Sequence, residues 1–309
     1  VQNASSTDAS VSVEYIPGSS GSAHTEGPVV IKPGASHSFD QHDLTALGTT
    51  FVGSAVVSSD QPIVATVMQV GETYKNMMGY NGFAGGSDTV SLPLVMANNN
   101  GFYTAFQVQN IGTSSTGITV SYGSNIGGTF APTDETATLA ANESMTFFQN
   151  SGQFASDTYI GSATITSGGE PIVAIVNQVK MTGVVLGTAY NGFDPTAATE
   201  KVSAPLVMAN NSGYYTGIQV MNVGGAPTDI TVTYGPNLAG AFAPAQELAT
   251  LAPGDSYNSI QNLGAWTGQT YVGSMTVEAS AGGTIVMIVN QIWPAAPGDQ
   301  FMTYDGFNY

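Results

Sequence analysis

Apolar and polar residues alternate along short segments of this chain. In residues 118–122 every second side chain is apolar, and the same alternation recurs in residues 11–15 and 230–234. A period of two predicts strands that bury one face. Turn-forming sequences separate these segments, and we expect the turns KPGAS, ANES and APGDS, at 32–36, 141–144 and 252–256, to close equivalent hairpins. No segment of ten residues shows a helical period, so the pattern predicts an all-β fold.

The strongest signal is internal repetition. PLVMANN occurs at 93–99 and again at 205–211, while YNGF occurs at 80–83 and 190–193 and returns as YDGF at 304–307. Two further markers occur three times in the same order: FVGSAVV, YIGSATI and YVGSMTV at 51–57, 159–165 and 271–277, and IVATVMQ, IVAIVNQ and IVMIVNQ at 63–69, 172–178 and 285–291. A period of about 112 residues is the size of a domain and too long for a solenoid repeat.

The repeat predicts three tandem immunoglobulin-like β-sandwich modules, at residues 1–86, 87–196 and 197–309. About seven short strands per module, separated by turns, is the pattern of such a sandwich. The linkers at 84–89 and 194–199 are short, so we expect neighbouring modules to touch. The IVxIVNQ strand is continuously apolar, which predicts a central strand buried on both faces.

The first module lacks part of the repeat. Val1–Gln2–Asn3 aligns with Val108–Gln109–Asn110, so the stretch equivalent to residues 90–107, including PLVMANN, is missing. A sandwich without its initial strand leaves a strand edge unpaired. We place that edge, as a candidate subunit interface, at Val11, Val13 and Tyr15. Two explanations remain open: the chain begins partway through a longer repeat protein, or a strand from another subunit completes the module.

The ordered markers PLVMANN, ITVxYG, APGxS, VGSxxV, IVxIVNQ and YNGF resemble the tandem Ig-like repeats of bacterial and archaeal cell-surface proteins. Such arrays form parts of adhesins, surface layers and extracellular filaments. The resemblance covers the whole chain at the level of architecture, and it carries over no functional residue.

Composition narrows the function further. The 309 residues include 42% hydrophobic but only 8% charged residues, with four lysines, no cysteine and a net charge of −17. Nucleic-acid binding needs cations, so we expect no nucleic-acid partner, and no segment is apolar over enough residues to insert in a membrane. A neutral surface rich in Ser, Thr, Asn and Gly suits a secreted protein at the cell surface. The first residues lack the features of a signal peptide, so we expect any such peptide to have been removed or to lie outside this chain.

Candidate catalytic and metal-binding groups are sparse. His24, His37 and His42 all lie in the first module, and the adjacent acids Asp134 and Glu135 are not both repeated elsewhere. No GxSxG elbow and no DxDxDG calcium loop occurs. We therefore expect no enzyme activity and no resident cofactor, with calcium bound by loop carboxylates kept as a hypothesis.

Asparagine carries the remaining candidates. Three sequons, at Asn3, Asn142 and Asn210, are candidate glycosylation sites. The segments MANNNGFY and MANNSGYY, at 96–103 and 208–215, combine amides with aromatic rings and could bind a sugar. We favour a structural role for these segments and for Asn191–Gly192, because Asn and Gly tolerate the left-handed backbone of tight turns.

The leading hypothesis is a structural subunit of an extracellular filament or surface layer, which polymerises with copies of itself. A cell-surface adhesin or carbohydrate-binding protein with glycan partners is the alternative. An extracellular hydrolase is the third candidate.

Overall fold

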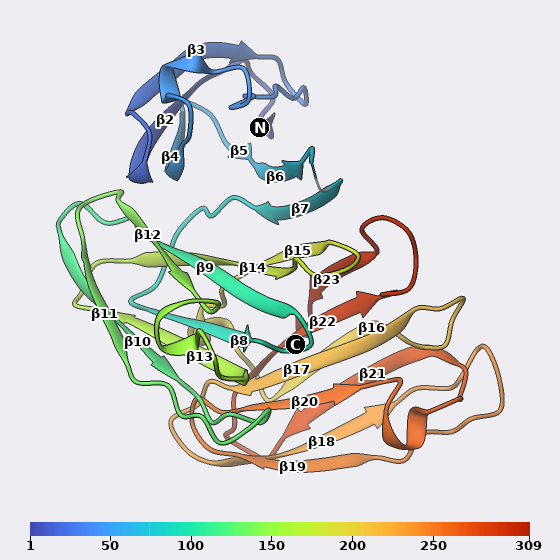
Figure 1. Ribbon diagram of the computed structural model, residues 1–309. Coiled ribbons are helices and arrows are strands. Elements are labelled where there is room, and N and C mark those ends of the chain that lie inside the picture. Colours follow the sequence, from blue (N-terminus) through green and yellow to red (C-terminus); the bar gives the residue numbers. More distant parts are fainter. Residues whose placement is uncertain (74) are drawn as a thin grey trace.

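The computed structural model describes residues 1–73 and 75–309, which fold into strands joined by turns and loops (Figure 1). Every pairing between the described strands is antiparallel. The helical elements of the described ranges are four single turns of 3-10 helix: η1 Thr45–Leu47, η2 Gly152–Phe154, η3 Pro195–Ala197 and η4 Gly264–Trp266. The predicted all-β class is confirmed.

The second module, residues 87–196, forms two four-stranded sheets. One has the strand order β11–β10–β13–β8 and the other the order β12–β9–β14–β15. The strands are β8 Thr89–Ala97, β9 Phe102–Asn110, β10 Thr116–Tyr122, β11 Glu135–Leu139, β12 Ser144–Phe148, β13 Tyr159–Ser167, β14 Ile172–Lys180 and β15 Leu186–Asn191. Both sheets contribute to one apolar cluster, which includes Phe106, Val120 and Val176. The alternating positions of the sequence thus form the core of a sandwich.

The third module, residues 197–309, repeats this arrangement. Its sheets have the orders β19–β18–β21–β16–β24 and β20–β17–β22–β23. The strands are β16 Lys201–Ala209, β17 Tyr215–Asn222, β18 Thr228–Tyr234, β19 Glu247–Leu251, β20 Ser256–Ile260, β21 Tyr271–Ala279, β22 Ile285–Ile292, β23 Phe301–Asp305 and β24 Phe307–Asn308. Ile218 and Val232, which the repeat equates with Phe106 and Val120, are likewise buried in the core.

The strand order is not that of an immunoglobulin domain. In the second module the first strand pairs with the sixth and the second with the seventh. An immunoglobulin constant domain instead has the orders ABED and CFG. The likeness therefore lies in the two-sheet sandwich and not in the strand order.

The first module, residues 1–86, has three smaller sheets, with the orders β3–β2–β4, β1–β5 and β6–β7. Its strands are β1 Gln2–Asn3, β2 Ala9–Ser20, β3 His24–Ile31, β4 Val52–Ser59, β5 Ile63–Val64, β6 Thr66–Gly71 and β7 Asn76–Asn81. The repeat equates β2, β3 and β4 with β10, β11 and β13, and β5 to β7 with β14 and β15. No described strand of the first module takes the place of β8. Its buried apolar residues form two clusters of only three each.

Three of the four single-turn helices, η1, η2 and η4, contribute to the cores. Each lies in the loop before the VGS strand, and each buries one large side chain: Leu47, Phe154 or Trp266. Phe154 contacts the rings of Tyr122 and Tyr159 edge-on, and Trp266 makes the same contacts in the third module. These turns are too short to give a helical period in the sequence.

Two predicted turns have a different role. The turn containing Asn142 joins β11 of one sheet to β12 of the other, so it crosses between the sheets and closes no hairpin. In YNGF, Tyr190 pairs with Val176 in one sheet, whereas Phe193 pairs with Ser91 in the other. Gly192 lets the strand change sheets, because a Cβ there would lie 2.5 Å from Val90 Cγ1. YNGF is therefore a crossing between sheets and not a tight turn.

The IVxIVNQ strand is central in both complete sandwiches. In the third module Ile288 is fully buried, and it belongs to the apolar cluster of the second module. In the second module the equivalent Ile175 is only half-buried. Burial on both faces is thus confirmed for β22 and incomplete for β14, because the outer face is covered only where a neighbouring module lies on it.

Candidate assembly interface

Asn3 is a structural residue and not an accessible sequon. Its side chain is fully buried, and its amide nitrogen donates to the carbonyls of Thr7 and Ile31, at 2.7 and 2.9 Å. The equivalent Asn110 and Asn222 are also fully buried and donate to carbonyls in the same way. The predicted glycosylation of Asn3 is wrong for the folded chain, because the amide nitrogen that would carry a glycan is buried and bonded.

The other two sequons lie at turns. Asn142 has a left-handed backbone, with φ of 63°, and is half-buried beside the first module. Asn210 is exposed, and its amide nitrogen donates to Gln269 O at 2.7 Å. Glycosylation of Asn142 and Asn210 stays a prediction.

The asparagine-rich segments hold their own loops. Asn98 has φ of 48°, and its amide donates to the carbonyls of Phe154 and Asp157, at 2.9 and 2.8 Å. Asn210 at the equivalent position has φ of 46°. These contacts tie the turn after β8 or β16 to the loop before β13 or β21, which agrees with the structural interpretation.

Of the two adjacent candidate acids, Glu135 is a hydrogen-bond acceptor for tyrosine, and so are Glu26 and Glu247 at the equivalent positions. Glu26, Glu135 and Glu247 accept a hydrogen bond from the hydroxyls of Tyr15, Tyr122 and Tyr234, at 3.1, 2.5 and 2.9 Å. Burial, aided by these carboxylates, raises the pKa of each tyrosine. His42 pairs with the neighbouring Asp43 in an exposed loop. Within residues 1–73 and 75–309, no three His, Asp or Glu side chains gather closely enough to hold a metal ion.

The predicted interface edge at Val11, Val13 and Tyr15 is wrong. These side chains lie in β2, which pairs with β3 on one side and β4 on the other, and all three are buried. Alternation had shown that the strand has a core face but could not show which strands flank it. The open edge of this sheet belongs to β4 instead, since β13, its equivalent in the second module, pairs with both β10 and β8.

The contact between modules is made twice with equivalent residues. Ser54 Oγ, in the VGS marker of the first module, donates to the carbonyl of Asn142 in a turn of the second, at 2.7 Å. Ser162 Oγ, in the VGS marker of the second module, donates to the carbonyl of Gly254 in the equivalent turn of the third. The strands that carry the YNGF marker also contact each other between modules: β15 of the second module lies against β7 of the first and β23 of the third. We call this repeated contact the module joint.

Polar side chains reinforce the module joint between the second and third modules. Gln178 and Asn290 exchange amide hydrogen bonds of 3.1 and 2.7 Å. Asp255 accepts from the backbone nitrogen and hydroxyl of Ser124, at 2.7 and 3.1 Å. Asp299 links all three modules, because its carboxylate accepts from Met77 N at 3.1 Å and from Gly187 N at 3.0 Å. Burial raises the pKa of Asp299.

No protein-family model matches this chain, and no curated protein matches it. None of the helices in the described ranges is long and apolar enough to cross a membrane.

Each half of the module joint is left open once, at one end of the row of modules. On the side of the VGS marker, Leu94 of the second module is 4% exposed, whereas the equivalent Leu206 of the third module is 38% exposed. On the opposite side, Val286 and Ile292 of the third module are 1% and 7% exposed, whereas the equivalent Val64 and Val70 of the first module are 56% and 66% exposed. The same positions are therefore buried inside the chain and uncovered at its two ends.

The polar groups of the module joint are open in the same way. Ser162 is buried at the joint, while its equivalent Ser274 is exposed. The carbonyl of Asn142 accepts from Gln109 of its own module as well as from Ser54. The carbonyl of the equivalent Gly34 accepts from Gln2 of its own module, and the turn that carries it is exposed. Gly34 therefore retains the acceptor that a serine of a preceding module would use.

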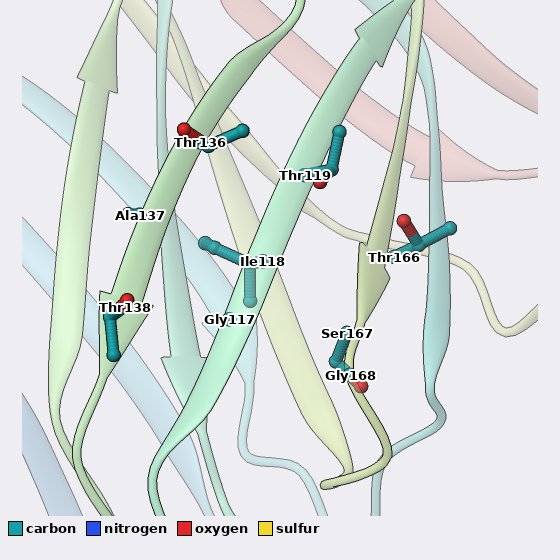
Figure 2. A pocket seen from close by; sticks show the side chains of 9 residues that line it. All are labelled: Gly117, Ile118, Thr119, Thr136, Ala137, Thr138, Thr166, Ser167 and Gly168. Carbon is teal, nitrogen blue, oxygen red and sulfur yellow. The ribbon is translucent and has the colours of Figure 1, made fainter.

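A hollow on the outer face of the second module is lined by small side chains, many of which carry hydroxyl groups. Figure 2 shows Thr136, Thr119 and Thr166 side by side across three strands, with Thr138 and Gly117 in the next row. Gly117 leaves space where the third module has Asp229. The nine lining residues are Gly, Ala, Ser, Thr and Ile. The hollow therefore offers hydroxyl groups but none of the aromatic rings on which a sugar would stack.

Proposed function

We propose that this protein is a structural subunit of an extracellular homopolymer, in which the third module of one copy meets the first module of the next through the module joint. The observation that carries the proposal is the doubled joint with one unused half at each end. A joint between two different surfaces adds subunits head to tail.

The open halves match in chemistry. Leu206 on one side and Val64 and Val70 on the other are apolar. Complete burial of one such side chain contributes roughly 1.5–3 kcal/mol to the free energy of association. Ser274 supplies a hydroxyl donor and Gly34 a carbonyl acceptor, as Ser162 and Gly254 do inside the chain. Contact between copies would thus reproduce a surface that the chain already forms with itself.

The composition supports a location outside the cell. Few charges and many hydroxyl and amide side chains give a surface that tolerates association, whereas cytosolic proteins keep more charge for solubility. The absence of cysteine removes any dependence on disulfides in that compartment.

Two blocking variants test the proposal. Leu206→Asp places a charge on the exposed half in the third module, and Val70→Asp does so on the half in the first module. Both side chains are exposed in the single chain, so each variant is expected to fold. We expect the unmodified chain to form fibres in negative-stain electron microscopy, and each variant alone to stay monomeric in sedimentation-velocity ultracentrifugation.

Mixing the variants gives the decisive result. The intact third module of Val70→Asp is expected to join the intact first module of Leu206→Asp, so an equimolar mixture should form dimers and stop there. Fibres from either variant alone, or a mixture that remains monomeric while the unmodified chain polymerises, would contradict head-to-tail joining through these surfaces. Val30→Asp, at an exposed valine on β3, is the control and should polymerise normally.

A further inference from the structure

The first module has open backbone edges in both of its layers. In the second module, β8 pairs with β13, and β9 pairs with β14 along nine residues. In the first module, β4 and β6 are the equivalents of β13 and of the later part of β14. Among the described residues, β4 pairs only with β2, and β6 pairs only with β7. The position of β8 in a complete sandwich, and the part of the β9 position beside β6, are therefore without a strand here, whereas β1 pairs with β5 as the end of β9 pairs with β14.

The side chains beside these edges are uncovered core residues. Ala55 on β4 is exposed, whereas the equivalent Ala163 is fully buried beneath β8. Val67 on β6 is half-buried, whereas the equivalent Val176 is fully buried. These side chains belong to inner faces, so solvent reaches the inside of the first module.

The next module is also incompletely covered at this place. Ile175 is half-buried, whereas its equivalent Ile288 is fully buried in one cluster with Leu94 of β8. A strand at the β8 position of the first module would therefore have a surface to cover on both of its faces.

Tyr80 is positioned to bond such a strand. In the second module the hydroxyl of the equivalent Tyr190 donates to Leu94 O of β8 at 2.7 Å and accepts from Leu94 N at 3.3 Å. In the third module Tyr304 makes the same two bonds with Leu206. No hydrogen bond of the Tyr80 hydroxyl is found in the described residues. Its ring is half-buried, and burial raises its pKa.

We infer that the first module binds a two-strand segment of this repeat with the sequence of β8 and β9, strands that lie in different sheets of the second module. The first strand of the segment would pair antiparallel with β4 and the second with β6, as β8 and β9 pair with β13 and β14. Leu92 is fully buried in the second module, so the bound strand must supply an apolar side chain at the position of Leu92, pointing into the first module. The backbone of the residue equivalent to Leu94 would meet the Tyr80 hydroxyl, as Leu94 meets Tyr190. Recognition then combines strand addition with alternate apolar side chains.

This binding is separate from head-to-tail polymerisation, because the two use opposite faces of β6. Val67 belongs to the inner face, while Val70 belongs to the outer face that the module joint would cover. Variants of the two residues therefore test the two proposals independently.

The probe is a synthetic peptide of residues 87–107, added to the full-length Val70→Asp chain so that polymers do not form. We expect saturable 1:1 binding, measured by fluorescence anisotropy, together with slower hydrogen–deuterium exchange in residues 52–59 and 66–71. Adding Val67→Thr places a hydroxyl against the bound strand, and adding Tyr80→Phe removes one hydrogen bond. Each change is expected to weaken peptide binding about five- to tenfold.

Three controls define the outcome. Tyr309→Phe, at an exposed tyrosine, should leave binding unchanged, and a peptide with Leu92→Asp should not bind. Circular dichroism will show that the Val67→Thr and Tyr80→Phe chains remain folded. Equal binding of the Leu92→Asp peptide, or binding without protection of β4 and β6, would overturn the inference, and so would an absence of binding.

Discussion

Replacing Gly235 by alanine is expected to hinder assembly while leaving the folded monomer as stable as before. Its equivalent Gly123 sits directly against the module joint: a Cβ there would lie 2.6 Å from Gly254 O and 3.4 Å from Asp255 Cα. A Cβ on Gly235 would lie 2.5 Å from Ser274 Oγ, which can rotate away, and no closer than 3.5 Å to backbone atoms. The two glycines thus differ chiefly in whether a following module is present.

The magnitudes follow from that difference. Gly123→Ala forces a backbone carbonyl to move at a closed joint, which costs roughly 1–3 kcal/mol by analogy with overpacking. Gly235→Ala has no such neighbour in the monomer, and the reduced freedom of the unfolded chain offsets any small cost. If a second copy closes the same joint at Gly235, the 1–3 kcal/mol appears in association instead. The critical concentration for assembly should then rise by roughly 5- to 150-fold, since 1.4 kcal/mol is a factor of ten.

Two measurements check this pair of variants. Urea denaturation should show a lower free energy of unfolding for Gly123→Ala and an unchanged one for Gly235→Ala. Pelleting over a concentration series should show a larger rise in the critical concentration for Gly235→Ala than for Gly123→Ala. If Gly235→Ala assembles at the wild-type concentration, the third module does not use the joint seen inside the chain, and the reasoning fails.

Three further results are expected. Burial raises the pKa of Asp305 from its ordinary value of 3.8 to about 6, so its stabilising contribution is complete below pH 4 and is lost as the pH rises through 6. Asp305→Asn should raise the melting temperature at pH 7.5 and leave it unchanged near pH 4, with a gain of at most about 1 kcal/mol, because Asp305 is still exposed to solvent. Asn110→Ala leaves buried carbonyls unpaired and should lower the free energy of unfolding by about 2–3 kcal/mol in urea, against no change for Asn150→Ala at an exposed turn. Finally, the net charge of −17 opposes assembly, so light scattering should increase when screening shortens the Debye length from about 30 Å at 0.01 M salt to about 8 Å at 0.15 M.

Periodicity and repetition predicted the fold because both are local or directly countable. Alternation at 118–122 and 230–234 placed Val120 and Val232 in the core, where they are fully buried. Three of the four repeat markers located strands in all three modules, and PLVMANN located β8 and β16 in the second and third. Neither signal carries pairing information, which explains why the edge was placed on β2 although that strand is flanked on both sides.

Other errors came from assigning a motif its commonest role. The Asn-Gly of YNGF predicts a tight turn, yet the sequence makes a strand change sheets at Gly192. Asn3 was a candidate glycosylation site because of its sequon, yet Asn3 is buried. A corrective signal was present in the repeat itself, because Asn110 and Asn222 stand at the same position without a sequon. An asparagine that recurs where the sequon does not is better explained by its hydrogen bonds.

The module joint could not be read from the sequence, since Leu94 and Leu206 occur in the same heptapeptide and differ only in what covers them. The joint connects two unlike surfaces, so each added module covers one such surface and presents a new one. Repetition within the chain therefore leaves one surface of each kind exposed. After two joints the halves at Leu206 and Val70 remain exposed, so the row of modules does not close on itself. Leu206 and Val70 are apolar, and the equivalent Leu94 and Ile292 are buried at the joint between the second and third modules. A module bound at either exposed surface would therefore remove apolar area from water, which favours association.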